Sequence, residues 1–266
     1  LADDDAHAIE LAKRYLAYFG PAAAPGEAPD PEPLRNLVPE NPRRAYDVKK
    51  VIAHIADVGS VLELKPSFGK SVVTSLVRFA GRAVGIVANQ PMHLGGAIDS
   101  AASVKAARFV QICDAYDIPL LLLCDTPGLM VGPEAEKTGL VRHSGRLLSA
   151  IANATTPMMT VVLRKAYGLG YYVMGSQPLE PAVLLAWPSA EYGGMGLGGA
   201  VNILHKAELA AFTDPAARAK RHAELTDELK REHAAVEAAG KFIYDNVIDP
   251  ADTREMLLRT LRTLAP

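Results

Sequence analysis

The sequence has little cysteine and no long hydrophobic run. Its 266 residues include two cysteines, Cys113 and Cys124, which lie in apolar segments where buried, reduced thiols are expected. This excludes a disulfide framework, and we expect no metal site and a cytoplasmic protein. No run of about 18 uncharged apolar residues occurs, so no spanning helix is expected. No signal peptide is expected, and a net charge of −2 favours neither nucleic acid nor membrane binding.

Several common catalytic motifs are also missing. No Gly-x-Ser-x-Gly elbow and no His-Glu-x-x-His pair occurs. The segment Gly69-Lys70-Ser71 resembles the end of a phosphate loop, but that loop needs a glycine five residues earlier, where Leu64 stands. His143 and Ser144 are neighbours on a predicted helix, so their side chains point roughly 100° apart and do not form a relay. The sequence therefore argues against a GTPase and against a serine hydrolase.

The composition is that of an ordinary globular chain, with 49% hydrophobic and 22% charged residues. Its length suits one large α/β domain or two small ones. Residues 3–19 carry apolar side chains at helical spacing, and residues 20–42 are rich in proline, alanine and glutamate. We predict an N-terminal helix and proline-rich linker over 1–45 and a folded domain over 46–266. Because the chain begins without methionine, we expect it to be a piece of a longer protein.

Strands and helices alternate through the folded region. Apolar runs predict strands over residues 72–79, 83–88, 120–124, 158–163 and 183–187. Helical spacing predicts helices over residues 48–55, 101–116, 140–154, 207–240 and 253–264. This alternation predicts an α/β fold.

Three loops that follow strands carry glycine. They contain Gly95-Gly96, Pro127-Gly128 and Gly168-Leu169-Gly170. Ligands bind at the carboxyl ends of parallel strands in α/β folds, so these loops would form one site if they share an edge of the sheet. Each glycine cluster could also be a simple turn.

The third loop has a chemical property of its own. A turn at Gly168 to Gly170 that starts a helix leaves backbone N–H groups unpaired, and the helix adds positive dipole there. Such a turn can hold an oxyanion without a catalytic side chain. The alternative is a tight strand-to-helix connection that binds nothing.

The order of many short motifs resembles a known family. The matching segments are Phe68-Gly69, Asn89-Gln90-Pro91, Asp99, Lys105 to Phe109, Asp125 to Gly128, Arg142-His143, Arg164 to Gly168 and Ala186 to Glu191. Together they resemble the C-terminal half of the carboxyltransferase β subunit of biotin-dependent acyl-CoA carboxylases, the propionyl-CoA and acetyl-CoA branch being nearest. The resemblance extends roughly from Pro31 to the C-terminus.

The resemblance implies a crotonase-like (ClpP/crotonase) fold, in which ββα units form a spiral with flanking helices. The family reaction moves CO2 from carboxybiotin to the α-carbon of an acyl-CoA, and oxyanions form on the biotin ureido oxygen and on the thioester oxygen. Preorganised N–H donors stabilise both. Biotin is carried on a partner carrier protein and is not attached to this chain.

Site residues follow from the same resemblance. The backbone of Gly168, Leu169 and Gly170 would form the oxyanion hole, and Tyr167, Pro127, Gly128 and Asn89 would bind biotin. The substrate pocket would include Gly95, Gly96 and Tyr172. Leu169 stands where the family commonly has glycine, and a leucine there needs a negative φ to avoid strain. A tyrosine at 172, where a smaller residue is common, should favour short acyl groups.

The resemblance also implies partners. These are a biotin carboxylase and biotin carboxyl carrier subunit, an N-terminal carboxyltransferase half, and further copies of the chain in a homo-oligomer. Two alternatives stay open: a non-catalytic oligomerisation module of the same fold, and a related CoA-ester decarboxylase or transcarboxylase.

Several side chains near these loops have simpler expected roles. We expect Asp125 to support the loop at Pro127-Gly128. Arg164 and Lys165 would be solvated charges or would fix the loop by capping carbonyls, and Trp187 would belong to the core.

Overall fold

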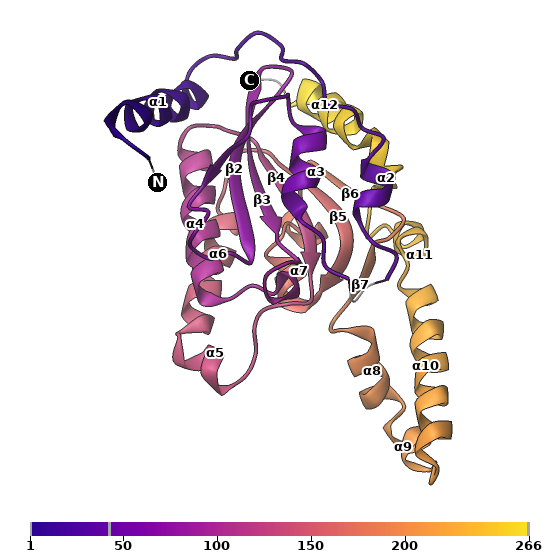
Figure 1. Ribbon diagram of the computed structural model, residues 1–266. Coiled ribbons are helices and arrows are strands. Elements are labelled where there is room, and N and C mark those ends of the chain that lie inside the picture. The colour runs from indigo at the N-terminus through magenta and orange to yellow at the C-terminus, as the bar shows by residue number, and fades with distance from the viewer. Residues whose placement is uncertain (1, 42–43, 265–266) are drawn as a thin grey trace.

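A mixed eight-stranded sheet forms the centre of the molecule (Figure 1). The computed structural model describes residues 2–41 and 44–264. Within them the strand order is β1-β2-β3-β4-β5-β6-β8, and β7 pairs with the end of β5. The strands are β1 (Leu62–Leu64), β2 (Val72–Phe79), β3 (Arg82–Asn89), β4 (Leu120–Thr126), β5 (Met158–Tyr167), β6 (Val183–Ala186), β7 (Glu191–Gly193) and β8 (Asn246–Val247).

The topology changes at β3. Strands β2 and β3 form an antiparallel hairpin through Ala80 and Gly81, whose φ angles are 47° and 85°. From β3 through β4, β5 and β6 to β8, neighbouring strands run parallel. The carboxyl ends of β3, β4 and β5 therefore lie at one edge, and the loops that follow these strands can meet there.

Helices cover both faces of the sheet, and the apolar runs explain why. In β4, Leu120 and Leu122 face one core cluster, and Leu121 and Leu123 face the other. The first cluster includes side chains of α4 (Ser100–Ala115) and α6 (Leu140–Ala152). The second includes side chains of α2 (Leu34–Leu37), α3 (Val48–Ile55) and α12 (Thr253–Thr263). The uninterrupted apolar strand β4 is thus buried by helices on both faces of the sheet.

The remaining helices lie in the connections between these elements. They are α5 (Pro133–Lys137), α7 (Gly168–Tyr172), α8 (Leu197–Leu204), α9 (Lys206–Ala210), α10 (Pro215–Glu232), α11 (Ala235–Gly240) and the 3₁₀ turns η1 (Ala17–Phe19), η2 (Leu94–Gly96), η3 (Gln177–Leu179) and η4 (Pro250–Asp252). In Figure 1, α8, α9 and α10 form an arm that projects from the sheet. No helix in the described part of the chain is long and apolar enough to cross a membrane.

Most predicted elements are confirmed, and several details were wrong. The helix predicted over 207–240 is three helices, because Pro215 begins α10 and the chain turns again before α11. Strand β5 extends to Tyr167, four residues beyond its predicted end. Strands β1, β7 and β8 were not predicted. The two cysteines are buried and free, and Trp187 is in the core, as expected.

The N-terminal segment packs against the domain. Helix α1 (Asp5–Leu16) begins at Asp4, whose side chain accepts from the His7 backbone N–H. Arg14 donates to the Gly59 and Val61 carbonyls, and Tyr18 is buried. The residues predicted as a linker include the short helix α2 and contact the β2–β3 turn, where the Ala23 N–H donates to the Gly81 carbonyl at 3.1 Å. The segment is therefore not a free tether, while the domain division after residue 45 stays a prediction.

A buried ion pair links the segment after α3 and the C-terminal helix α12 to the β2–β3 hairpin. Asp57 accepts hydrogen bonds from Arg254 of α12 and from the backbone N–H groups of Ala80 and Gly81. Arg254 also donates to the Ile55 carbonyl at 2.6 Å. Burial alone would raise the pKa of the Asp57 carboxyl, but the hydrogen bonds from Gly81, Arg254 and Ala80 outweigh it and lower the pKa.

Replacing Arg254 by methionine should destabilise the protein by about 3–5 kcal/mol at pH 7, because it leaves the Asp57 carboxylate buried without its cation. A carboxyl whose pKa is lowered on folding stabilises the folded state at pH values above its unfolded pKa of about 4. This stabilisation is lost as the pH falls through the pKa of the folded state. Urea unfolding of wild type and Arg254→Met should therefore converge below about pH 4. Arg259→Met, an exposed arginine on the same helix, should change stability little, and equal effects of the two substitutions would contradict this role.

Candidate functional site

The three glycine loops meet at the carboxyl ends of β3, β4 and β5. A Cβ atom built on Gly96 would lie 2.3 Å from the Asp125 carbonyl oxygen, so the first loop lies against the end of β4. A Cβ atom on Gly170 would lie 2.6 Å from Cα of Gly128, so the third loop lies against the second. Glycine is required at both positions because no side chain fits. The predicted convergence of the loops is therefore observed.

The turn after β5 has unpaired main-chain donors. Gly168 adopts a φ of 54° and begins α7, in which Leu169 and Gly170 hold the second and third positions. A helix supplies no backbone acceptor for N–H groups there, and none is found for these two among residues 2–41 and 44–264. Leu169 is not left-handed, so it carries no backbone strain, and its side chain is 49% exposed. Both N–H groups therefore lack a backbone partner in the described part of the chain.

Thr126 shapes the second loop. Its hydroxyl accepts from the Gly128 N–H and also contacts the Gly128 carbonyl oxygen, both at 3.1 Å. The same carbonyl accepts from the Ile98 N–H at 3.1 Å, which joins this loop to the residues that precede α4. The Asp125 carboxylate is engaged by Arg164 and Lys165 and makes no hydrogen bond to Pro127 or Gly128 among the described residues, so the support of this loop expected from Asp125 is indirect.

The Asp125 carboxylate lies in a fully buried cluster beneath the loops. One oxygen lies 3.1 Å from Nε and 3.1 Å from Nη2 of Arg164. The other accepts from the Lys165 backbone N–H at 3.2 Å and lies 3.6 Å from the Lys165 ammonium. The side chain of Arg164 is 4% exposed and that of Lys165 is 15% exposed. Neither is a solvated charge, and this alternative was wrong, since the carboxylate compensates the burial of both cations.

Side chains of β3 and β5 hold the first glycine loop in place. Asn89 ends β3 and is fully buried; its amide donates to the Gly96 carbonyl at 3.3 Å and accepts from the Asp125 N–H at 3.1 Å. The Lys165 ammonium donates to the Gly95 carbonyl at 3.0 Å. Two side chains, Asn89 and Lys165, thus hold the carbonyls of Gly96 and Gly95. Capping of a carbonyl by Lys165, one of the expected roles, is confirmed.

Tyr167 and Tyr172 flank the turn at Gly168. The Tyr167 hydroxyl is buried and donates to Glu191 of β7 at 2.6 Å. Burial, followed by the Glu191 hydrogen bond, raises the pKa of the Tyr167 hydroxyl, so this group stays protonated at neutral pH. Tyr172, the last residue of α7, is half-buried. Tyr167 therefore positions the turn and does not act as a base.

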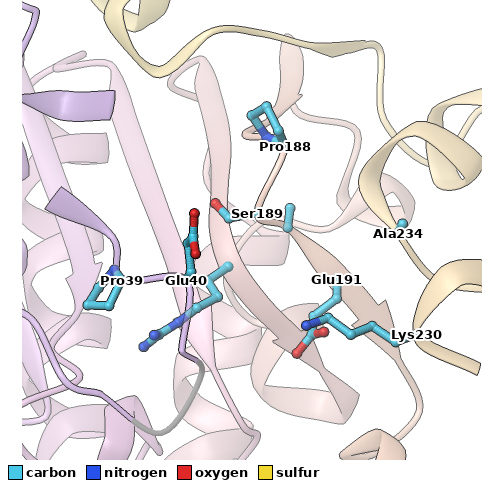
Figure 2. Close-up of a pocket in the computed structure, with 9 residues that line it drawn as sticks. Pro39, Glu40, Pro188, Ser189, Glu191, Lys230 and Ala234 are labelled. Atoms are coloured by element: carbon cyan, nitrogen blue, oxygen red, sulfur yellow. The ribbon is translucent and has the colours of Figure 1, made fainter. Parts of the chain in front are cut away.

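Two cavities of about 370 Å³ lie on different sides of these loops. One is beside the first loop, between Leu94, the start of α4, Met130-Val131 and α5. The other, shown in Figure 2, lies between the segment with Pro39 and Glu40 and the helix ends that carry Lys230 and Ala234. Arg164 and Glu191 also line it, so it opens behind the turn.

The arrangement can stabilise a developing negative charge through main-chain groups. Preorganised N–H donors in a glycine turn, backed by rigid buried contacts, suit an oxyanion. Sequence reasoning found the glycines but missed Thr126 and the partnership of Tyr167 with Glu191. The alternation along an extended β5 could have indicated that Lys165 points toward the loops, had its end been placed correctly.

Comparisons with known proteins agree on one family. The family model of the carboxyl transferase domain matches residues 1–265. The chain is 41% identical over 265 residues to the propionyl-CoA carboxylase carboxyltransferase subunit of Haloferax mediterranei, covering 98% of this chain and 51% of that protein. The chain thus spans about half the length of the relative that it matches.

Solved structures give the same result. The transcarboxylase 12S crystal structure, described as a hexamer with methylmalonyl-coenzyme A bound, superposes with a TM-score of 0.92 at 40% identity, covering 98% of this chain and 52% of that one. A single-chain, multi-domain long-chain acyl-CoA carboxylase gives a TM-score of 0.88 at 46% identity, covering 97% and 25%.

The contact between Gly170 and Gly128 can be tested by stability. Gly170→Ala should destabilise the protein by about 1–3 kcal/mol, because the new methyl group meets the Gly128 backbone. Gly145→Ala is the matched control: Gly145 lies within α6, no atom lies within 4 Å of its built Cβ, and alanine should stabilise the helix by up to about 1 kcal/mol. Urea unfolding measures both, and a neutral Gly170→Ala would contradict the close approach of the loops.

Proposed function

The chain belongs to the carboxyl transferase domain family, and from this membership we propose that it transfers a carboxyl group from carboxybiotin to the α-carbon of a short acyl-CoA. Its fold is the crotonase-like α/β fold of the carboxyltransferases that it superposes on. The observation that carries the proposal is the pair of N–H groups at Leu169 and Gly170 without a backbone partner, in the turn that packs against the second glycine loop.

The residues present fit the ureido ring of biotin. Two adjacent main-chain donors suit its carbonyl oxygen, and Gly170, which has no side chain, packs directly against the Gly128 backbone and so fixes the turn relative to the second loop. Biotin, carried on a partner protein, supplies the carboxyl group. The chain contributes by binding the ureido oxygen, by orienting the ring, and by stabilising negative charge as it develops on that oxygen.

The other predicted site residues divide by how they could act. Pro127 and Gly128 lie in the loop against Gly170 and would contact biotin through their backbone. Asn89 and Tyr167 have side chains engaged by protein groups, so their part in biotin binding would be indirect. Gly95, Gly96 and Tyr172 would border the acyl-CoA.

A partner surface is needed to complete such a site. Large apolar side chains near the loops are exposed, and they are Met92, Leu94, Val131, Leu169 and Met195. Exposed apolar groups of this kind mark interaction surfaces. We propose that the N-terminal carboxyltransferase half of another copy covers them in a homo-oligomer, that a biotin carboxylase and carrier subunit deliver biotin, and that the assembly works in the cytoplasm.

A transcarboxylase or a decarboxylase activity on a CoA ester is the second candidate function. The similarity to transcarboxylase 12S favours a transcarboxylase as strongly as a carboxylase, because both need the same oxyanion donors. A decarboxylase would use them in reverse. A non-catalytic oligomerisation module is disfavoured, since the donors at Leu169 and Gly170 are intact.

The oxyanion role can be tested by removing one N–H group. Leu169→Pro deletes the donor at a helix position where proline is tolerated, whereas Leu169→Ala removes the side chain and keeps the donor. Leu169→Pro should lower kcat roughly 10²–10³-fold, and Leu169→Ala should stay within a few-fold of wild type. The assay is carboxyl transfer from free carboxybiotin to propionyl-CoA by the full natural polypeptide that contains this chain.

Two controls accompany this experiment. Thermal unfolding must show that Leu169→Pro is folded. His143→Ala should cost little, because the proposal assigns no proton transfer to a nearby side chain. Loss of activity in His143→Ala together with normal activity in Leu169→Pro would reject the oxyanion assignment.

Tyr172 should limit acyl length. Tyr172→Ala is expected to raise the ratio of kcat/KM for octanoyl-CoA over propionyl-CoA by about tenfold or more, since pocket fit discriminates roughly 10- to 200-fold per methylene. Tyr116→Ala, at an exposed tyrosine that follows α4, should leave the ratio unchanged. A wild-type preference for the longer ester would contradict the proposed short substrate.

A further inference from the structure

Lys165 connects two loops of the site that are far apart in sequence. Its backbone belongs to β5, three residues before Gly168. Its ammonium donates to the carbonyl of Gly95, in the loop after β3, at 3.0 Å. Its backbone N–H donates to the Asp125 carboxylate at the end of β4. One residue of β5 therefore contacts both the end of β4 and the loop that follows β3.

The first loop needs such a tether because its backbone is unusual. Leu94, Gly95 and Gly96 have φ angles of 52°, 62° and 86°, three consecutive residues in the left-handed region. Leucine pays a steric cost in this region, and strained segments persist where surrounding contacts hold them. The contacts that hold the Gly95 and Gly96 carbonyls come from Lys165 and Asn89. Asn89 is neutral and fixes Gly96; Lys165 fixes Gly95 with a charged donor, which makes the stronger hydrogen bond.

The ammonium is itself held in place. It lies 3.6 Å from the Asp125 carboxylate, and Arg164 binds the opposite oxygen of that carboxylate. Arg164 is fixed in turn, since its guanidinium donates to the Arg44 carbonyl at 3.0 Å and lies over the Tyr46 ring. The chain of contacts from Arg164 through Asp125 to Lys165 is rigid and mostly buried. A movement of Lys165 would move the first loop relative to the turn.

We propose that Lys165 is a positioning residue for carboxyl transfer. It keeps the loop that contains Gly95 at a fixed position relative to the turn at Gly168 to Gly170. This inference rests on the proposed function. It assigns Lys165 no contact with substrate: the residue acts through the Gly95 carbonyl, so it should govern the alignment of the two bound groups more than the affinity for either.

The test compares Lys165→Met, Lys165→Arg and the control Lys220→Met, an exposed lysine on α10, in the full natural polypeptide. Lys165→Met should lower kcat roughly 10- to 100-fold, the loss typical of a hydrogen bond to a charged group, with KM for propionyl-CoA changed less than about threefold. Lys165→Arg should recover most of kcat because it restores a charged donor. Lys220→Met should behave as wild type.

A local measurement separates positioning from general stability. Amide hydrogen exchange in Lys165→Met should increase in a peptide that contains residues 93–97, while peptides from β2 stay protected. An unchanged kcat, an increase confined to KM, or equal loss of activity and melting temperature in Lys165→Met and Lys165→Arg would each overturn the inference. If the wild-type polypeptide transfers no carboxyl group, the proposed function fails; if only the Lys165 effects are missing, this inference alone fails.

Discussion

The burial of Asp125 is the constraint on which the site depends. A carboxylate without water costs several kcal/mol unless cations and hydrogen bonds compensate it. Here Arg164, the Lys165 backbone and the Lys165 ammonium provide that compensation, and all belong to the neighbouring strand. The Asp125 N–H is engaged by Asn89 of the strand on the other side. One charged residue thus joins three parallel strands where their loops begin, and fixes the loops relative to the sheet.

Close backbone contacts supply the second part of this rigidity. Gly96 lies against the Asp125 carbonyl and Gly170 against Gly128, at separations where a side chain would collide. The loops are therefore positioned by main chain against main chain, with buried side chains beneath. This suits chemistry that uses N–H donors, because preorganised dipoles contribute most when they need not reorganise during the reaction.

The sequence predicted the elements whose signals are local. Apolar runs gave β2 to β6, and helical spacing gave α4 and α6 to within a few residues. Strands β1, β7 and β8 were missed because two or three residues carry too weak a pattern. The convergence of the glycine loops was predictable from strand polarity. The buried state of Arg164 was not, because its partner Asp125 lies 39 residues away and charge alone favours exposure.

The proposed use of main-chain donors would also explain why a leucine at 169 is compatible with the site. A substituent at 169 points outward, since the side chain is 49% exposed, while its N–H keeps its direction through the helical backbone. At the two neighbouring positions a side chain is disfavoured. Gly168 has a positive φ, and a Cβ built on it lies 3.0 Å from the Gly194 carbonyl oxygen. A Cβ built on Gly170 would collide with the Gly128 backbone. The backbone conformation is therefore restricted at 168 and 170, whereas a change of side chain at 169 would alter the outer surface and leave the proposed N–H donors in place.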